Sequence, residues 1–209
     1  MSARELFDRY FGQCPLVAII RGVKPDEAEA IGRALFDGGI RIIEVPLNSP
    51  DPFASIRRIA DALGDDALVG AGTVLRPADV DRVKEAGGRI VVSPNMNPTV
   101  IEATAAAGLI SSPGIFTPSE AFAALEAGAH ALKLFPAEAA SPAVVKSIRA
   151  VLPTDVPLLV VGGVTPDAVR GWLDAGADGF GLGGGIYKPG QSPDDTLAKA
   201  RAYVEAVRR

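Results

Sequence analysis

Short apolar segments recur along the whole chain, most of them bounded by glycine or proline and several rich in valine and isoleucine. Runs of this length and composition are typical of parallel strands that are buried on both faces. The pattern therefore predicts a series of buried strands. The predicted strands are 16–20 (LVAII), 40–45 (IRIIEV), 67–71 (ALVGA), 89–92 (RIVV), 108–112 (GLISS), 130–135 (HALKLF), 157–161 (PLLVV) and 178–182 (DGFGL).

Helical patterns with recognisable start and stop signals lie between these segments. The start signals place proline near the first turn, together with an acid or hydroxyl that can accept from unpaired N–H groups. They are Lys24-Pro25-Asp26-Glu27, Arg76-Pro77-Ala78-Asp79, Thr117-Pro118-Ser119-Glu120 and Thr165-Pro166-Asp167. The stop signals end in a glycine that can adopt the left-handed conformation, at Gly39, Gly87, Gly128 and Gly176.

Alternation of strand and helix over the whole chain indicates a (β/α)8 TIM barrel with an extra N-terminal helix over residues 2–11. The 209 residues are fewer than the roughly 250 typical of this fold, so the loops must be short. We expect a single barrel domain over residues 1–209. The alternative is an open doubly wound sheet, which usually carries a glycine fingerprint after its first strand. The first turn, at residues 21–25, has no such fingerprint.

Composition and charge exclude several classes of protein. The net charge is −4, and no Lys/Arg run is present, so a nucleic-acid partner has little support. No apolar stretch reaches the roughly 18 residues of a membrane span, and the N-terminus does not read as a signal peptide. The only cysteine, Cys14, precedes an apolar strand and is expected to be a buried structural thiol, which suits a cytoplasmic location.

In a barrel of this type, the chemistry lies at the carboxyl ends of the strands. The residues at those positions are therefore expected to converge on one rim. They are Arg21, Glu44, Gly72-Thr73, Ser93-Pro94-Asn95, Pro113-Gly114, Lys133, Gly162-Gly163 and Gly183-Gly184-Gly185.

Lys133 is the most informative of these residues, because it is the only lysine that interrupts an apolar strand. Strand alternation places it with Ala131 and Phe135 on the interior face. A buried lysine tends to lose its proton, and a neutral amine can attack a ketone to form an iminium. Glu44, at an equivalent depth in the second strand, could transfer protons. The pattern alone leaves open a purely structural ion pair between these two residues.

Other rim residues fit the binding of an anionic ligand. Gly162-Gly163 and Gly183-Gly184 follow the seventh and eighth predicted strands, where many barrels bind phosphate. Arg21 and Thr73 fit carboxylate and hydroxyl recognition. The only histidine, His130, has the parity opposite to Lys133 and is expected outside the site. Without a second histidine or clustered carboxylates, we expect no catalytic metal.

The chain resembles the 2-keto-3-deoxy-6-phosphogluconate and 2-keto-3-deoxy-6-phosphogalactonate aldolases, which are class I lyases. The resemblance covers roughly residues 15–207. It rests on the motifs AIIRGV, IIEVPLNSP, VGAGTVL, VSPN, ALEAGAHALKLFPAE, VVGGVTPD and GLGGGIY.

The resemblance implies a role for each candidate residue. Lys133 would form the Schiff base, and Glu44 would transfer protons through a water. Arg21 and Thr73 would bind the pyruvyl end of the substrate. The pocket walls would be Pro94, Pro113 and Phe135, and the phosphate cradle Gly162, Gly163, Gly183 and Gly184. The partners would be a phosphorylated keto-deoxy sugar acid and pyruvate, with no cofactor and with assembly as a homotrimer.

Two positions favour the galactonate branch of the family, and with it a role in galactonate degradation. PLNSP follows Glu44, where gluconate enzymes usually carry an Arg-Thr pair. Val161 precedes the Gly-Gly turn, where the gluconate type tends to have threonine. Gly184 departs from a frequent serine, which removes a hydroxyl contact to phosphate.

Three other functions stay open from the sequence. The chain could be an aldolase for the gluconate isomer or for a broad range of 2-keto-3-deoxy acids. It could be a non-catalytic phosphate-binding barrel, in which Lys133 and Glu44 only stabilise each other. It could also be a phosphate-barrel isomerase or synthase, whose reactions need no iminium.

Overall fold

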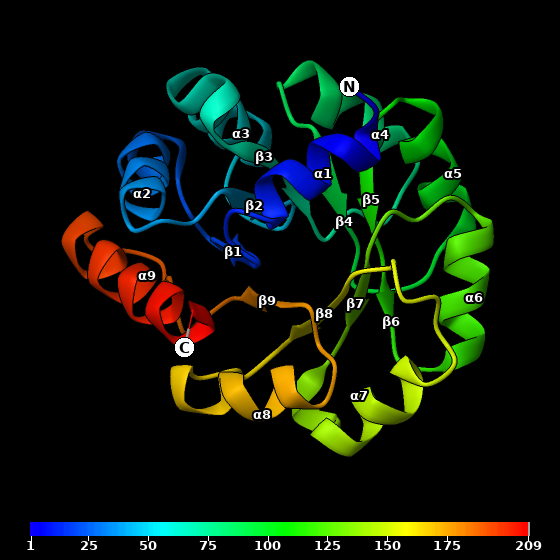
Figure 1. Ribbon diagram of the computed structural model, residues 1–209. Coiled ribbons are helices and arrows are strands. Elements are labelled where there is room, and N and C mark those ends of the chain that lie inside the picture. The colour runs from blue at the N-terminus through cyan, green and yellow to red at the C-terminus, as the bar shows by residue number, and fades with distance from the viewer. Residues whose placement is uncertain (209) are drawn as a thin grey trace.

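The computed structural model describes residues 1–208, in which parallel strands form a central barrel with helices packed around it (Figure 1). The strands lie within a few residues of the predicted segments. They are β1 (Leu16–Ile19), β2 (Ile42–Pro46), β3 (Leu68–Gly72), β4 (Ile90–Val92), β5 (Ile110–Ser112), β6 (Gly114–Ile115), β7 (Leu132–Leu134), β8 (Leu158–Val161) and β9 (Gly179–Leu182).

The helices begin at or near the predicted signals. At Thr117, the side chain accepts from the Glu120 N–H and the Glu120 side chain accepts in return, so both capping interactions form. Thr165-Pro166 opens a short 3-10 turn, 166–168, which delays the eighth helix to Val169. The helices are α1 (Ala3–Phe11), α2 (Pro25–Asp37), α3 (Pro52–Leu63), α4 (Ala78–Glu85), α5 (Pro98–Ala106), α6 (Pro118–Glu126), α7 (Pro142–Arg149), α8 (Val169–Asp174) and α9 (Pro193–Arg208).

The sheet curves into a nearly closed barrel, so the predicted barrel is confirmed and the open doubly wound sheet is wrong. The strand order is β5-β4-β3-β2-β1-β9-β8-β7-β6, and every neighbouring pair is parallel. The two end strands, β5 and β6, are consecutive in the chain and separated only by Pro113. The fifth predicted strand, 108–112, corresponds to β5 alone, and β6 lies beyond its predicted end. Because proline has no N–H to donate, pairing is interrupted at Pro113: β5 pairs with β4, and β6 pairs with β7.

Apolar side chains form two separate cores, one between sheet and helices and one inside the barrel. Leu132 and Leu134 pack under the helices and Ala131 packs inside, as the alternation along β7 predicts. Cys14 is buried in the outer core, and burial raises the pKa of its thiol to about 11. The prediction of a buried structural thiol is therefore confirmed.

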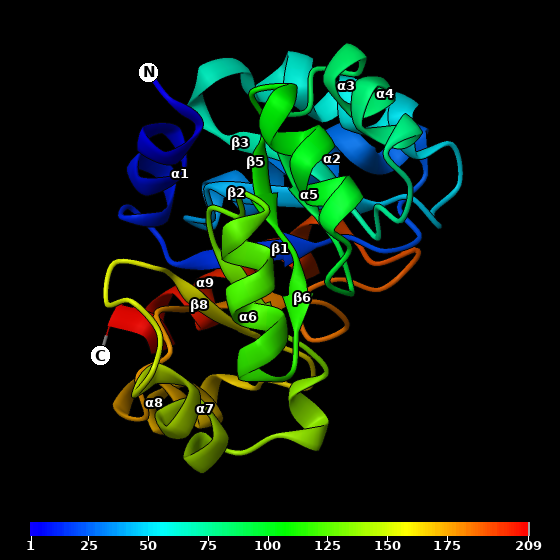
Figure 2. The same ribbon diagram turned by 90° about the vertical axis from the view of Figure 1, so that its right-hand side faces the viewer.

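Helix α1 crosses the opening of the barrel that lies at the amino ends of the strands (Figures 1 and 2). Phe7 and Tyr10 of this helix belong to the interior core. The predicted extra N-terminal helix thus covers one end of the barrel, and the carboxyl ends of the strands form the other.

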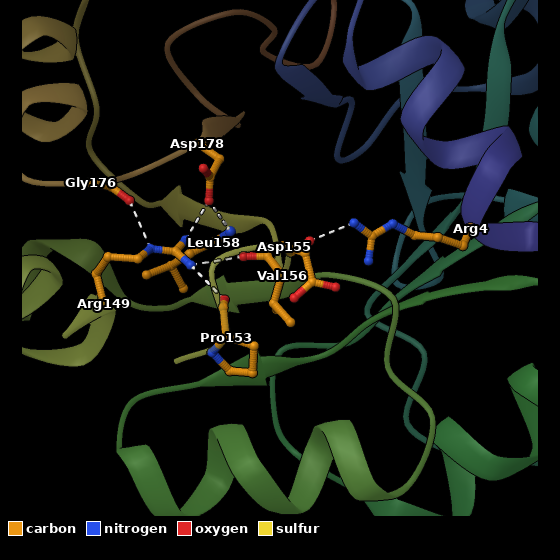
Figure 3. Close-up of polar contacts among 8 residues, drawn as sticks. All are labelled: Arg4, Arg149, Pro153, Asp155, Val156, Leu158, Gly176 and Asp178. Atoms are coloured by element: carbon orange, nitrogen blue, oxygen red, sulfur yellow. Dashed lines mark hydrogen bonds and ion pairs between the residues drawn. The ribbon is translucent and has the colours of Figure 1, made fainter. Parts of the chain in front are cut away.

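Arg149, at the end of α7, holds together the segments that lead into β8 and β9 (Figure 3). Its guanidinium donates to the carbonyl oxygens of Val156 (2.9 Å) and Gly176 (3.2 Å) and pairs with the carboxylate of Asp178. Asp178 also accepts from the Leu158 N–H at 2.7 Å. These contacts fix where β8 and β9 begin, and therefore where their glycine-rich ends lie. Within residues 1–208, no helix is both long enough and apolar enough to cross a membrane.

Candidate active site

A cleft of about 720 Å³ opens at the carboxyl ends of the strands. Nearly all of the sequence-predicted site residues line it, although they come from strands and loops far apart in the chain. Those residues are Arg21, Thr73, Pro94, Lys133, Phe135, Val161, Gly162, Gly163, Gly183 and Gly184. Pro113 is absent from the lining, so its expected place as a pocket wall is wrong. Its carbonyl instead accepts from the Lys133 N–H at 2.9 Å, within the barrel wall.

Glu44 lies below this cleft, in a small interior cavity that Lys133 also lines. The cavity has a volume of about 10 Å³, which is room for about one water molecule. Its other walls are almost entirely apolar, among them Phe7, Val17 and Leu159. Because Lys133 lines both spaces, its side chain connects the buried carboxylate to the open cleft.

Lys133 and Glu44 come from opposite sides of the barrel. Lys133 is on β7 and Glu44 on β2, four strands apart in either direction around the barrel when β5 and β6 are taken as one broken strand. Lys133 is 7% exposed and Glu44 1%. The barrel interior therefore brings an amine and an acid together in a space with little water.

Burial changes the pKa of both groups toward their neutral forms. Desolvation raises the pKa of Glu44 to about 7, against the opposing influence of the positive charges of Lys133 and Arg21. Desolvation likewise lowers the pKa of Lys133; Glu44 opposes this change, and Arg21 adds to it. An amine that loses its proton readily is a competent nucleophile, and an acid that titrates near neutrality can both take and give a proton.

Lys133 and Glu44 do not form a direct ion pair. Among the ion pairs within 4.0 Å in residues 1–208, none involves Lys133 or Glu44. Oε2 of Glu44 is buried and has no hydrogen-bond partner among residues 1–208. The Lys133 Nζ lies 4.8 Å from the ring centroid of Phe135, on the cleft side. A purely structural salt bridge would require a contact that the geometry does not provide.

Gly72 makes room for the buried carboxylate. A Cβ at this position would overlap Oε2 of Glu44. The next residue, Thr73, has a φ of 54°, which is uncommon for a residue other than glycine. The end of β3 is therefore shaped around Glu44 on one side and turns Thr73 toward the cleft on the other.

The loop after β2 holds Arg21, and sequence reasoning did not identify this contact. The Arg21 guanidinium donates to Oδ1 of Asn48 and lies 3.4 Å from Oγ1 of Thr73. Oγ of Ser49 accepts from the Gly22 N–H at 2.9 Å. Both Asn48 and Ser49 belong to the PLNSP motif, so the signal was present, but only the fold shows that this motif lies against the first loop.

The glycines of the two final turns differ in what they accommodate. Gly162 and Gly163 have φ values of 120° and 61°, and a Cβ at either would crowd the side chain of Glu138. At Gly183 and Gly184, a Cβ would meet nothing within 4 Å. Packing therefore does not require these last two glycines, and their backbone is open to a ligand.

Five polar residues that line the cleft were not predicted as site residues. They are Glu138, Thr165, Tyr187, Lys188 and Tyr203. The Tyr187 hydroxyl donates to Oε1 of Glu27 at 3.1 Å. Burial is the main cause that raises the pKa of Tyr187, and the contact with Glu27 is the second. Lys188 adds a cation to the lining of the cleft.

His130 lies away from the cleft, as expected. Its Nδ1 accepts from the Ser111 N–H at 3.1 Å, and burial lowers the pKa of the ring. In the described residues, no group of three or more His, Cys, Asp or Glu side chains is arranged to hold a metal ion.

Comparison with known proteins identifies the family. The family model "KDPG and KHG aldolase" matches residues 8–194, so the chain belongs to this aldolase family. The chain is 48% identical over 194 residues to the 2-dehydro-3-deoxy-6-phosphogalactonate aldolase of Escherichia coli (strain K12). The aligned region covers 93% of this chain and 95% of that protein.

Solved structures agree with this assignment. A structure described as native KDPGal superposes with a TM-score of 0.92 at 48% identity and covers 94% of this chain and 95% of that one. A protein cage designed by fusing symmetric oligomeric domains matches with a TM-score of 0.91 and 48% identity over 92% of this chain and 72% of that one. The barrel fold therefore has close structural relatives.

The raised pKa of Glu44 predicts a pH-dependent effect of Glu44→Gln on stability. Because the folded state favours the protonated acid, the wild-type contribution of Glu44 is fully present below pH 4.5 and is lost as the pH rises through about 7. Glutamine stays neutral throughout. We expect the variant to gain stability relative to wild type as the pH rises, by on the order of 3 kcal/mol above pH 7.

Urea unfolding from pH 4.5 to pH 8.5 measures this difference. Glu29→Gln is the matched control, because Glu29 forms an exposed pair with Arg33 and should show only a small, nearly constant change. A Glu44→Gln difference that stays flat across this range would contradict the prediction.

Proposed function

We propose that the protein is a class I aldolase that cleaves 2-dehydro-3-deoxy-6-phosphogalactonate to pyruvate and D-glyceraldehyde 3-phosphate. The observation that carries this proposal is Lys133, a buried lysine without an ion-pair partner in the described residues, at the floor of an open cleft. Family membership and 48% identity to an aldolase of this name support it. The whole chain would act as one barrel domain, and no cofactor enters the reaction.

The chemistry begins with Lys133. Its neutral amine attacks the C2 ketone of the substrate, and loss of water gives an iminium linked to Nζ. The iminium accepts the electron pair of the C3–C4 bond when that bond breaks. The released fragment is the aldehyde phosphate, and the three remaining carbons stay on Lys133 as an enamine. Protonation at C3 and hydrolysis then release pyruvate and restore the amine.

Glu44 is the proposed proton carrier of the reaction. Cleavage of the C3–C4 bond requires removal of the C4 hydroxyl proton, and the enamine afterwards requires a proton at C3. A carboxyl group with a pKa of about 7 can do both at neutral pH. The cavity that it shares with Lys133 has room for about one water, which could relay the proton.

The two ends of the cleft suit the two charged ends of this substrate. Arg21 and Thr73 lie together and would bind the carboxylate beside the reacting ketone. The backbone at Gly162, Gly163, Gly183 and Gly184 would hold the phosphate, with Lys188 nearby. Pro94 and Phe135 would form walls between these ends.

Val161 is the proposed contact for substrate choice. It lines both the inner cavity and the cleft, between Lys133 and the glycine turn that follows β8. The C4 hydroxyl, whose configuration separates the galactonate and gluconate compounds, would lie near this position. An apolar side chain there offers no hydrogen bond, so it favours one isomer only modestly.

We also propose a homotrimer in the cytoplasm. The rim between α6 and α7 exposes several apolar side chains around a shallow groove, including Phe116, Phe122 and Val151. An exposed apolar patch of this kind is typical of an interaction surface. The match to a domain used in a symmetric oligomeric cage supports assembly of the chain with itself.

Trapping with pyruvate tests the Schiff base. Borohydride reduction in the presence of pyruvate should add one reduced pyruvyl group to the protein, and peptide mapping should locate it on Lys133. Lys133→Arg should form no adduct and lose at least roughly 10⁴-fold in turnover, because a guanidinium stays protonated. Lys146→Arg, at an exposed site on α7, is the control and should keep both. Binding of a sugar phosphate without a pyruvate adduct would favour a non-catalytic barrel instead. Retained turnover in Lys133→Arg would favour an isomerase or synthase.

Substrate preference is tested by Val161→Thr. Threonine has a similar shape and supplies a hydroxyl, so the ratio of kcat/KM for the galactonate compound over the gluconate compound should fall by about 10-fold or more. The ratio is measured with both phosphorylated acids and lactate dehydrogenase coupling. A wild-type enzyme that prefers the gluconate compound would contradict the proposed substrate.

The proposed assembly predicts a particle of three chains of 21.6 kDa each in light scattering. Phe122→Glu should dissociate it, because the charge would be buried in the interface. Leu75→Glu, at an exposed apolar position in the loop between β3 and α4, should leave the mass unchanged. A wild-type monomer at micromolar concentration would contradict a homotrimer.

A further inference from the structure

We propose that α1 is a plug whose Phe7 keeps water out of the cavity shared by Lys133 and Glu44, and so sets the pH range in which Lys133 reacts. The inference rests on the proposed function, because it concerns the reactivity of the Schiff-base lysine. It assigns a role to a helix that lies outside the repeating units of the barrel.

Phe7 belongs to the site although it lies far from it in the sequence. Its side chain is 0% exposed and lines the same small cavity as Lys133 and Glu44. Its ring stacks on Phe11 with centroids 4.9 Å apart. Gly179 makes room for this pair, because a Cβ there would lie 2.6 Å from the Phe11 ring. The floor of the cavity is therefore the aromatic side chain of Phe7, which lies on α1.

Contacts at two points fasten α1 across the barrel. Tyr10 donates its hydroxyl to the carbonyl oxygen of Asp65, in the segment that leads into β3, at 2.6 Å. Arg4 donates to the carbonyl oxygen of Asp155, in the segment that leads into β8, as Figure 3 shows. Ser2 and Glu5 form a capping box at the start of the helix. These contacts hold α1 in a fixed position and so keep Phe7 inside the barrel.

Phe7 shields the lysine from below, and Glu44 is the only other charged residue among the described residues that line this cavity. Burial is the largest cause of the lowered pKa of Lys133, ahead of the charges of Glu44 and Arg21. The other charged residues, Glu138 and Lys188, line the open cleft and not this cavity, and Glu138 lies against Gly162 and Gly163. Helix α1 carries two charged residues near the barrel, Arg4 and Asp8. Their charges affect the pKa of His130 and are not among the causes that shift the pKa of Lys133.

A smaller side chain at position 7 should hydrate the pair. The cavity would grow from room for about one water to room for more than one, and added water stabilises an ammonium. The pKa of Lys133 should then rise, which leaves less neutral amine at neutral pH. The loss should disappear at high pH, where the amine is deprotonated in both proteins.

The experiment measures the rate of pyruvate adduct formation under borohydride as a function of pH. Phe7→Leu and Phe7→Met should move the midpoint upward by about one pH unit, with roughly tenfold slower trapping at pH 7 and wild-type rates above the new midpoint. Phe11→Leu is the matched control, because Phe11 lies on the same helix but not in the lining of the cavity. Its midpoint should equal that of wild type.

Each outcome decides between specific alternatives. A purely structural role for Phe7 would slow trapping equally at every pH, and unchanged midpoints in both Phe7 variants would overturn the inference. An equal shift in Phe11→Leu would assign the effect to helix packing in general and would overturn it as well. If wild type forms no adduct, the proposed function fails; if wild type traps pyruvate and the midpoints coincide, only the role of Phe7 fails. Methionine has nearly the same volume as leucine, but its flexible side chain adapts better to the space left by the ring, so this variant carries the test if the leucine variant does not fold.

Discussion

Two ionisable side chains share an almost dry cavity in the barrel, and neither has a counter-charge within ion-pair distance in the described chain. Burying an amine and an acid in this way is costly, because the charged forms lose their hydration. Lys133 and Glu44 reduce that cost by shifting toward neutrality, as the directions of their pKa changes show. The same shift makes one a nucleophile and the other a proton carrier, so the source of instability is also the proposed source of reactivity.

The rest of the structure can be understood from the need to keep this pair dry on one side and accessible on the other. Helix α1 closes the barrel at the amino ends of the strands, where Phe7 forms the floor. At the carboxyl ends, the loops open into a cleft that exposes Lys133 to substrate. Arg149 fixes the starts of β8 and β9 and thereby the glycine turns at their other ends. Stability and function thus occupy opposite ends of the same strands, as is usual for this fold.

Sequence reasoning succeeded where a local pattern carries the information. A lysine that interrupts an apolar run must be buried, and turns after the final strands must share one rim, so Lys133 and the glycine turns could be predicted. The failures concern contacts between distant segments. Pro113 was expected in the cleft but divides a strand, since its missing N–H acts on pairing rather than on the pocket. Phe7 and the contact of Asn48 with Arg21 depend on how a helix and a loop meet the barrel, which no local pattern states.

The absence of a side chain at Gly72 has a consequence for how this protein can change. The Glu44 carboxylate occupies the space that any larger residue at position 72 would need. The two positions lie on the neighbouring strands β2 and β3, and the space between them accommodates the side chain of only one of them. A substitution at either position therefore alters which residues the other can accept, and relatives that keep the acid should also keep the glycine.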